Sequence, residues 1–119
     1  MDSTAIEFRN SALGILKFLS SPSEQKAFAS KVEYIDYQSE FVCWWFDDLV
    51  MESLPKGTGL ISQSFNESER LILWEFTKLF DQNIDSQDQP IDDLLQSPQW
   101  QLIVEAAKVA FGKISVKAT

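Results

Sequence analysis

The sequence predicts an all-α fold, a single-domain bundle of about five helices spanning residues 1–119. Three observations favour this fold. Apolar residues recur mostly at the 3.6-residue spacing of helices, helix-start signals precede several of these stretches, and 119 residues are about the length of one domain. The composition is 45% hydrophobic and 13% aromatic, so we expect a core that needs no disulfide or metal to fold.

Two helices are predicted in the N-terminal third. Residues 4–7, Thr-Ala-Ile-Glu, have the spacing of a capping box. The stripe that follows consists of Phe8, Ala12, Ile15, Leu16 and Leu19. Residues 21–24, Ser-Pro-Ser-Glu, start a second helix with a cap, a proline and a glutamate at favoured positions. Its buried side is marked by Phe28, Val32 and Ile35.

The next segment suits a helix or a strand. Residues 41–46 are aromatic and β-branched, as in a buried strand. Helical spacing also links Val42, Phe46 and Leu49, which we expect to face the core. Because acids flank this run, we predict a helix over 38–53, with minor strand content in 41–65 as the alternative. Residues 55–59 should end the helix, and 60–65 should be extended or irregular.

Two longer helical patterns fill the C-terminal half. Residues 66–69, Asn-Glu-Ser-Glu, open a helix through Phe80 whose apolar residues wrap most of its circumference, which predicts a central position. A polar loop and a short helical turn around 91–95 follow. Ser97 and Pro98 then start a last helix, which Gly112 is expected to end or fray. Its apolar face carries Trp100, Ile103, Val104, Ala107, Phe111 and Ile114.

The net charge of the chain is the feature that says most about its function. Eighteen acids face ten Lys and Arg, which gives a net charge of −8 with no histidine. Such a surface repels phosphate backbones and anionic membranes, so we expect no nucleic-acid and no membrane binding. It favours a basic protein partner. The alternative is that the acids only keep an aromatic-rich protein soluble.

Three other features of the sequence favour a cytoplasmic location. The N-terminus lacks the charged and apolar regions of a signal peptide. A single cysteine suits a reducing compartment. The longest apolar run, residues 41–46, is far shorter than the roughly 20 residues that span a bilayer.

The chain lacks the residues that most enzyme classes need for catalysis. Without histidine the chain has no Ser–His or Cys–His dyad, and one cysteine cannot build a zinc site. Cys43 lies among apolar neighbours, so we predict an inert core cysteine. Neither Asp47–Asp48 nor Asp92–Asp93 converges on one substrate by itself, because helical neighbours diverge by about 100°, and a paired-carboxylate enzyme would need tertiary contacts between acids. We therefore expect a protein that is not an enzyme and holds no cofactor or metal.

Residues 81–92 partly match a calcium loop. Aspartate or asparagine occupies the first, third and fifth positions, and Asp92 falls at the twelfth. However, Ser86 replaces the glycine of the sharp turn, Asp92 is shorter than the usual glutamate, and Asp88 takes the inward apolar position. We interpret the stretch as a solvated acidic loop.

Protein recognition remains as a function. Trp44 could anchor a partner beside acids that complement a basic surface. We predict that the partner-binding residues are Trp44, Asp47, Asp48, Glu52, Asp81, Asp85, Asp88, Asp92 and Asp93. If 38–53 is one helix, Trp44, Asp48 and Glu52 lie on the same side.

Five short motifs are spread along the C-terminal half: Asn66–Arg70, Leu79–Asp81, Leu94–Leu95, Ser97–Gln101 and Val104–Lys108. In this combination the chain resembles the small acidic immunity proteins of bacterial contact-dependent growth inhibition systems. The resemblance implies a cytoplasmic protein that binds and neutralises a cognate toxin, often a basic nuclease domain. The alternatives are an acidic adaptor or subunit of a larger complex, and a carboxylate-based or metal-dependent enzyme.

Overall fold

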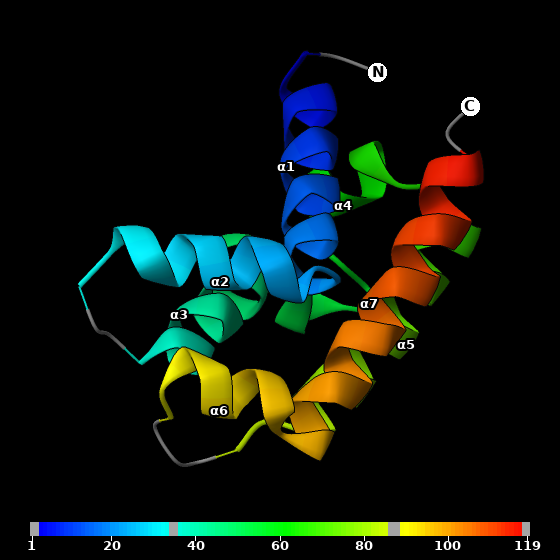
Figure 1. Ribbon diagram of the computed structural model, residues 1–119. Helices are drawn as coiled ribbons and strands as arrows, with labels where there is room; N and C mark the ends of the chain where they lie inside the picture. Colours follow the sequence, from blue (N-terminus) through cyan, green and yellow to red (C-terminus); the bar gives the residue numbers. More distant parts are fainter. Residues whose placement is uncertain (1–2, 34–35, 86–88, 118–119) are drawn as a thin grey trace.

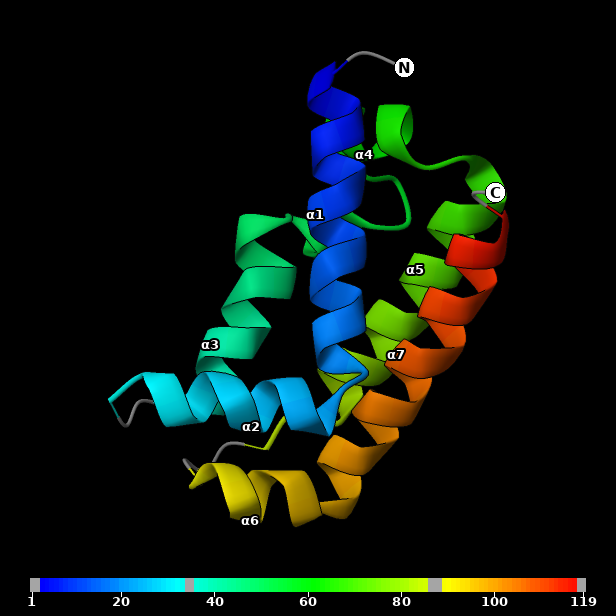
Figure 2. The ribbon, with the colours of Figure 1, turned by 45° about the horizontal axis from the view of Figure 1, so that its top comes forward.

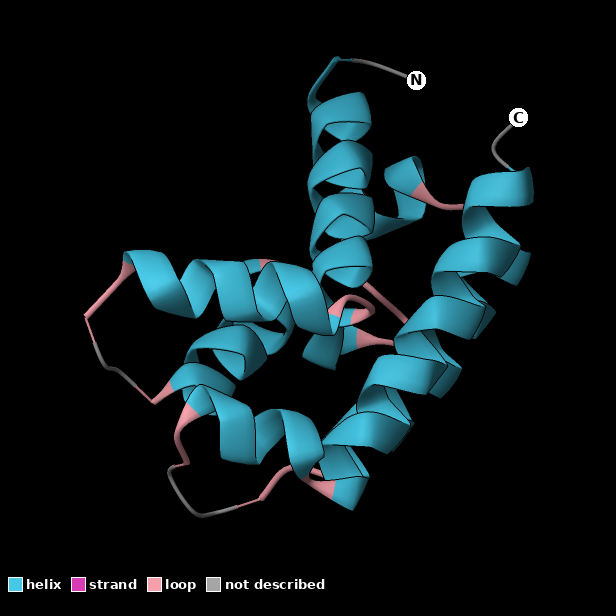
Figure 3. Ribbon diagram, in the orientation of Figure 1, coloured by secondary structure: helices cyan, strands magenta, loops and turns pink. Residues whose placement is uncertain are grey.

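The computed structural model describes residues 3–33, 36–85 and 89–117, and these residues form seven α-helices and no strand. Figure 3 shows the helical character of the whole described chain. The α-helices are α1 (Ser3–Leu19), α2 (Pro22–Lys31), α3 (Tyr37–Cys43), α4 (Gly59–Ser64), α5 (Glu67–Gln82), α6 (Ile91–Gln96) and α7 (Pro98–Lys117). A π-helical turn, η1 (Trp44–Asp48), and a 3-10 turn, η2 (Met51–Ser53), follow α3. The all-α prediction is confirmed.

The long helices α1, α5 and α7 organise the fold. Helices α5 and α7 run antiparallel and side by side, and α1 packs against α7 (Figures 1 and 2). Helix α4 packs on α1, while α2 turns across the end of α1 and contacts α6. Helix α7 therefore contacts both α1 and α5.

A buried glutamine ties three of these helices together. Gln25 of α2 donates its amide to the backbone oxygens of Phe18 (3.2 Å) and Leu19 (3.0 Å) at the end of α1. Its side-chain oxygen accepts from Trp100 Nε1 of α7 at 2.9 Å. Because every polar atom of this buried amide has a partner, the contact fixes the corner between α1 and α2 without a desolvation penalty.

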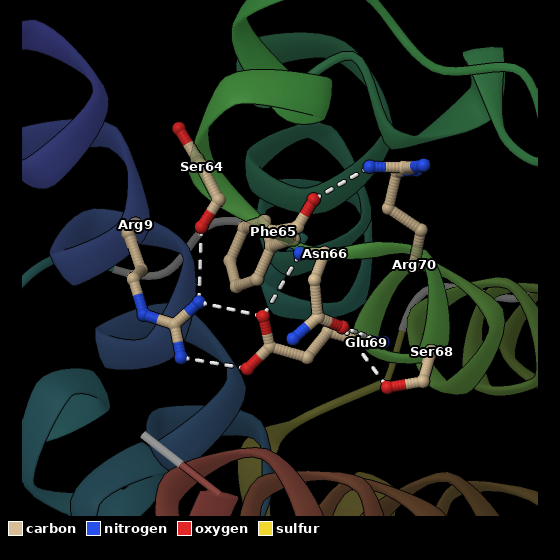
Figure 4. A network of polar contacts seen from close by, with 7 residues as sticks. All are labelled: Arg9, Ser64, Phe65, Asn66, Ser68, Glu69 and Arg70. Atoms are coloured by element: carbon tan, nitrogen blue, oxygen red, sulfur yellow. Dashed lines mark hydrogen bonds and ion pairs between the residues drawn. The ribbon is translucent and has the colours of Figure 1, made fainter. Parts of the chain in front are cut away.

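A second buried network joins α1 to α4 and α5 (Figure 4). The Arg9 guanidinium donates to both carboxylate oxygens of Glu69, at 2.9 and 2.8 Å, and to the backbone oxygen of Ser64 at 2.9 Å. Glu69 also accepts from the backbone N–H of Asn66, whose side chain caps α5. The predicted capping box is thus confirmed, and its glutamate is also half of a buried ion pair. The hydrogen-bonded carboxylate raises the pKa of Arg9, which keeps the guanidinium charged.

Three local predictions are wrong. Residues 60–65 are not extended, because Thr58 caps helix α4 by accepting from the backbone N–H of Ile61 at 3.1 Å. Gly112 does not end the last helix, which continues to Lys117 because the apolar stripe runs on to the buried Ile114. Val32 is exposed because α2 stops at Lys31. Ile35 lies outside the described residues.

Candidate protein-binding site

The predicted single helix over 38–53 is broken at Val50. Asp36 caps α3 by accepting from the backbone N–H of Ser39 at 3.1 Å. The helix then widens into η1, and Val50 adopts a left-handed conformation with φ of 55° before η2 begins. The expectation that Trp44, Asp48 and Glu52 share one helix face is therefore wrong.

The break has a physical cause in the core pattern. Between residues 41 and 50 the buried residues are Phe41, Trp45 and Leu49, spaced four residues apart. A continued helix would bring Glu52 onto the same side and bury its carboxylate. The bend at Val50 instead leaves Glu52 exposed and buries Met51.

The two adjacent tryptophans have different environments. Trp45 is fully buried, and its Nε1 donates to Thr77 Oγ1 at 3.0 Å. Trp44 is half-buried in a cluster with Phe18, Phe28 and Phe41, and its Nε1 donates to Glu40 at 3.2 Å. Val42 and Phe46, expected in the core, are half-buried. Only part of the Trp44 side chain is therefore available to a partner.

The structure brings Glu52 and Asp81 together. Both line a hollow of about 250 Å³ between η2 and the end of α5, together with Phe46, Trp74, Thr77 and Lys78. The Lys78 ammonium lies 5.3 Å from the centroid of the Trp74 ring. Two carboxylates therefore lie beside partly exposed aromatic rings, and Lys78 shows that a cationic side chain can lie against one of these rings.

Asp85 is held against α3 by a reciprocal pair of hydrogen bonds. Gln38 Nε2 donates to the backbone oxygen of Asp85 at 2.7 Å, and the Asp85 N–H donates to Gln38 Oε1 at 3.0 Å. This contact places Asp85 beside α3, and Asp47 and Asp48, both exposed, lie on η1, which follows α3 directly. We call Asp47, Asp48, Glu52, Asp81 and Asp85 the acidic face.

The remaining predicted residues do not join the acidic face in the same way. Asp92 and Asp93 are exposed on α6, which packs on α2, and Asp92 pairs with Lys26 at 3.4 Å. Asp88 lies outside the described residues. Trp74 and Lys78 also line the hollow but were not predicted from the sequence. Their spacing to Asp81, at i, i+4 and i+7, could have indicated that all three share one side of α5.

Cys43 is exposed, so the prediction of a core cysteine is wrong. On α3 the core side is set by Phe41, and a residue two positions later points about 200° away from it. Desolvation by neighbouring groups, then the hydrogen bond and negative charge of Asp47, raise the pKa of the thiol, and Glu40 and Asp48 add to this effect. The exposed thiol therefore stays protonated to higher pH than an ordinary cysteine.

We expect iodoacetamide to alkylate Cys43 in the folded protein at pH 8 more slowly than in the urea-unfolded chain. The thiolate is the nucleophile, and a raised pKa lowers its fraction at a given pH. Replacing Asp47 with asparagine should speed the reaction, because it removes a negative charge and leaves only a weaker, neutral acceptor for the thiol. Mass spectrometry over pH 6–10 would measure both rates. Faster labelling of the folded protein would contradict this expectation.

Within the described residues, no three His, Cys, Asp or Glu side chains come close enough to hold a metal ion. In the stretch compared with a calcium loop, Asp81 lies in the last turn of α5, and Asn83 Nδ2 donates to the backbone oxygen of Leu79 at 2.8 Å. Across the same described residues, we find no helix with the length and apolar character needed to cross a membrane. Comparison with family models, curated proteins and solved structures gave no match for this chain.

Proposed function

We propose that this protein is an immunity protein that binds a basic toxin domain through the acidic face. The observation that carries the proposal is the approach of Glu52 to Asp81 around the rings of Phe46 and Trp74. Two acidic stretches of sequence meet there beside aromatic groups. A site of this composition fits an arginine or lysine of a partner, whose charge the carboxylates would pair and whose stem the rings would cover.

The acidic face is also held in place before binding. The side chain of Gln38 fixes the backbone of Asp85, and the hydrogen bond from Trp45 to Thr77 joins η1 to α5. A preorganised surface loses less conformational entropy on association than a mobile one. Tight, fast binding is what neutralisation of a toxin requires, which favours this role over a loose acidic adaptor.

Inhibition would follow from the chemistry of the partner. A nuclease binds its substrate through cationic groups that contact phosphates. Carboxylates of the acidic face would occupy such groups and exclude the nucleic acid. The sequence resemblance to immunity proteins supports this interpretation, as does the net charge of −8.

We expect that replacing Asp48 and Glu52 with lysine weakens binding to the toxin encoded by the neighbouring gene more than about tenfold. Both residues are exposed, so the fold should remain intact. Biolayer interferometry would measure the affinity, and thermal melting would check folding. The on-rate of the unaltered chain should fall as salt rises, because a Debye length of about 8 Å screens long-range attraction at physiological ionic strength.

The matched control replaces Glu7 and Glu105, two exposed acids away from the acidic face, with lysine. This variant has the same net charge as the Asp48→Lys/Glu52→Lys variant. Comparing the two separates the loss of a local contact from the effect of a changed net charge. The control variant should bind within about threefold of the unaltered chain, and cells that express it should survive the toxin. Normal binding by the folded Asp48→Lys/Glu52→Lys variant would show that these acids serve solubility alone.

A further inference from the structure

Helix α5 has a third side that the fold covers only in part. One side enters the core through Leu73, Phe76 and Phe80, and a second side carries Trp74, Lys78 and Asp81 at the acidic hollow. The third side presents Leu71, Ile72 and Leu79. Leu71 is 58% exposed. The sequence predicted a central helix because apolar residues surround α5, and on this side that prediction is wrong for the isolated chain.

The adjacent side of α7 is apolar as well. Leu102 and Val109 are 54% and 55% exposed, and with Ala106 they follow the i, i+4, i+7 spacing of a helix-packing stripe. A groove of about 440 Å³ runs between the helices. We call the exposed surface around it the α5–α7 groove; it is lined by Leu71, Ile72, Glu75, Phe76, Leu79, Ala106, Val109, Ala110 and Lys113. Two antiparallel helices thus present apolar residues along a single surface, in the manner of half a four-helix bundle.

We propose that the α5–α7 groove binds a second copy of this chain. The charged residues that line it are one acid, Glu75, and one base, Lys113. The groove is therefore electrically balanced on a protein whose net charge is −8, and it offers no attraction to a basic partner. A balanced pair on opposite sides of a groove is instead self-complementary, since a two-fold axis can bring each charge to the opposite charge of the other copy.

The arrangement of the helices favours a particular two-fold axis. An axis parallel to the helix pair, between the two copies, stacks α5 of each copy on α7 of the other. Because α5 and α7 are antiparallel within one chain, the stacked helices are antiparallel too (Figures 1 and 2). Glu75 then faces the helix of the second copy that carries Lys113. Glu75 also lies 3.3 Å from Lys78 in its own helix, an exposed contact that a new partner can replace.

The available area predicts a weak dimer. Helix α5 has 16 residues, hence a length of about 24 Å, and two neighbouring helices are about 20 Å wide. The face therefore offers roughly 500 Å² from each copy, or about 1,000 Å² in total, near the lower limit for a specific interface. We expect a dissociation constant on the order of micromolar and a monomer–dimer equilibrium that follows protein concentration.

Sedimentation equilibrium between about 1 and 500 μM, a range chosen to bracket the expected micromolar affinity, tests the proposal. The unaltered chain should shift from monomer to dimer, and added salt should strengthen association by screening the repulsion between two acidic chains. Replacing the exposed Val109 with aspartate should weaken dimerisation more than about tenfold. The same substitution at Ile6, which is 46% exposed on α1, is the matched control and should leave dimerisation unchanged.

A charge exchange tests the pairing itself. Glu75→Lys should weaken the dimer, and Glu75→Lys with Lys113→Glu should restore it, because the exchanged charges again face each other. Melting at 1 μM would show that each variant folds. A chain that remains monomeric at 500 μM overturns the proposal and leaves the groove to another protein. A dimer that Val109→Asp does not weaken overturns it as well, because the contact then lies elsewhere. Neither outcome depends on the acidic face or on a toxin.

Discussion

Replacing Arg9 with methionine is expected to destabilise the protein by about 3–5 kcal/mol. The Glu69 side chain is only 4% exposed, and the Arg9 guanidinium is its bidentate partner at 2.8 and 2.9 Å. Removing the arginine leaves a buried carboxylate that still accepts a hydrogen bond from the Asn66 N–H but has lost its cationic partner. An uncompensated buried charge costs far more than the pair itself contributes, since much of the Coulomb energy only offsets desolvation.

A double-mutant cycle in urea separates these contributions. Glu69→Gln keeps an acceptor for the Asn66 N–H but removes the charge, so Arg9→Met with Glu69→Gln should be less destabilised than Arg9→Met alone. The matched control is the exposed pair of Glu105 and Lys108, at 3.2 Å, where Lys108→Met should cost less than about 0.5 kcal/mol. All chains should be compared at one low protein concentration, because self-association adds apparent stability. A cost below about 1 kcal/mol for Arg9→Met would show that the pair is effectively solvated.

Two helix starts that depend on local chemistry were predictable from the sequence, whereas the capping box expected at 4–7 does not mark a start, because α1 already includes Ser3. The cap formed by Ser21, with Pro22 at the start of α2, and the capping box of α5 are both present. These signals work because a side chain satisfies a backbone N–H only three residues away. Helix α4 has a similar cap at Thr58, but its six residues are too short for an apolar period to be recognised.

Contacts between distant residues were not predictable in this way. The partner of Glu69 lies 60 residues earlier, at Arg9, and the Gln38–Asp85 contact spans 47 residues. The sequence indicated which acidic residues could bind a partner but not which of them lie close together. Tertiary packing places Glu52 and Asp81 at one hollow, whereas Asp92 pairs with Lys26. Cys43 shows the same limit, since its apolar neighbours in sequence point in different directions around the helix.

Replacing Trp45 with alanine is expected to cost about 3–5 kcal/mol, because its ring is fully buried and its loss would leave a cavity in the core. The ring packs edge-on against Phe76 with centroids 5.1 Å apart. Its indole N–H donates to Thr77 Oγ1, but that hydroxyl also donates to the backbone oxygen of Leu73, so Thr77 keeps a partner in the variant. The loss is therefore one of packing and cavity formation more than of hydrogen bonding.

The neighbouring Phe46 provides the contrast, because sequence spacing expected it in the core. Its ring contacts Phe80 with centroids 5.2 Å apart but is half-buried beside the acidic hollow. Phe46→Ala should cost only about 1–2 kcal/mol, since much of the ring already contacts water. It should also weaken toxin binding, whereas Trp45→Ala should act through stability. Urea denaturation of both variants measures the difference, and equal losses would mean that the π-helical turn does not separate a core side from a binding side.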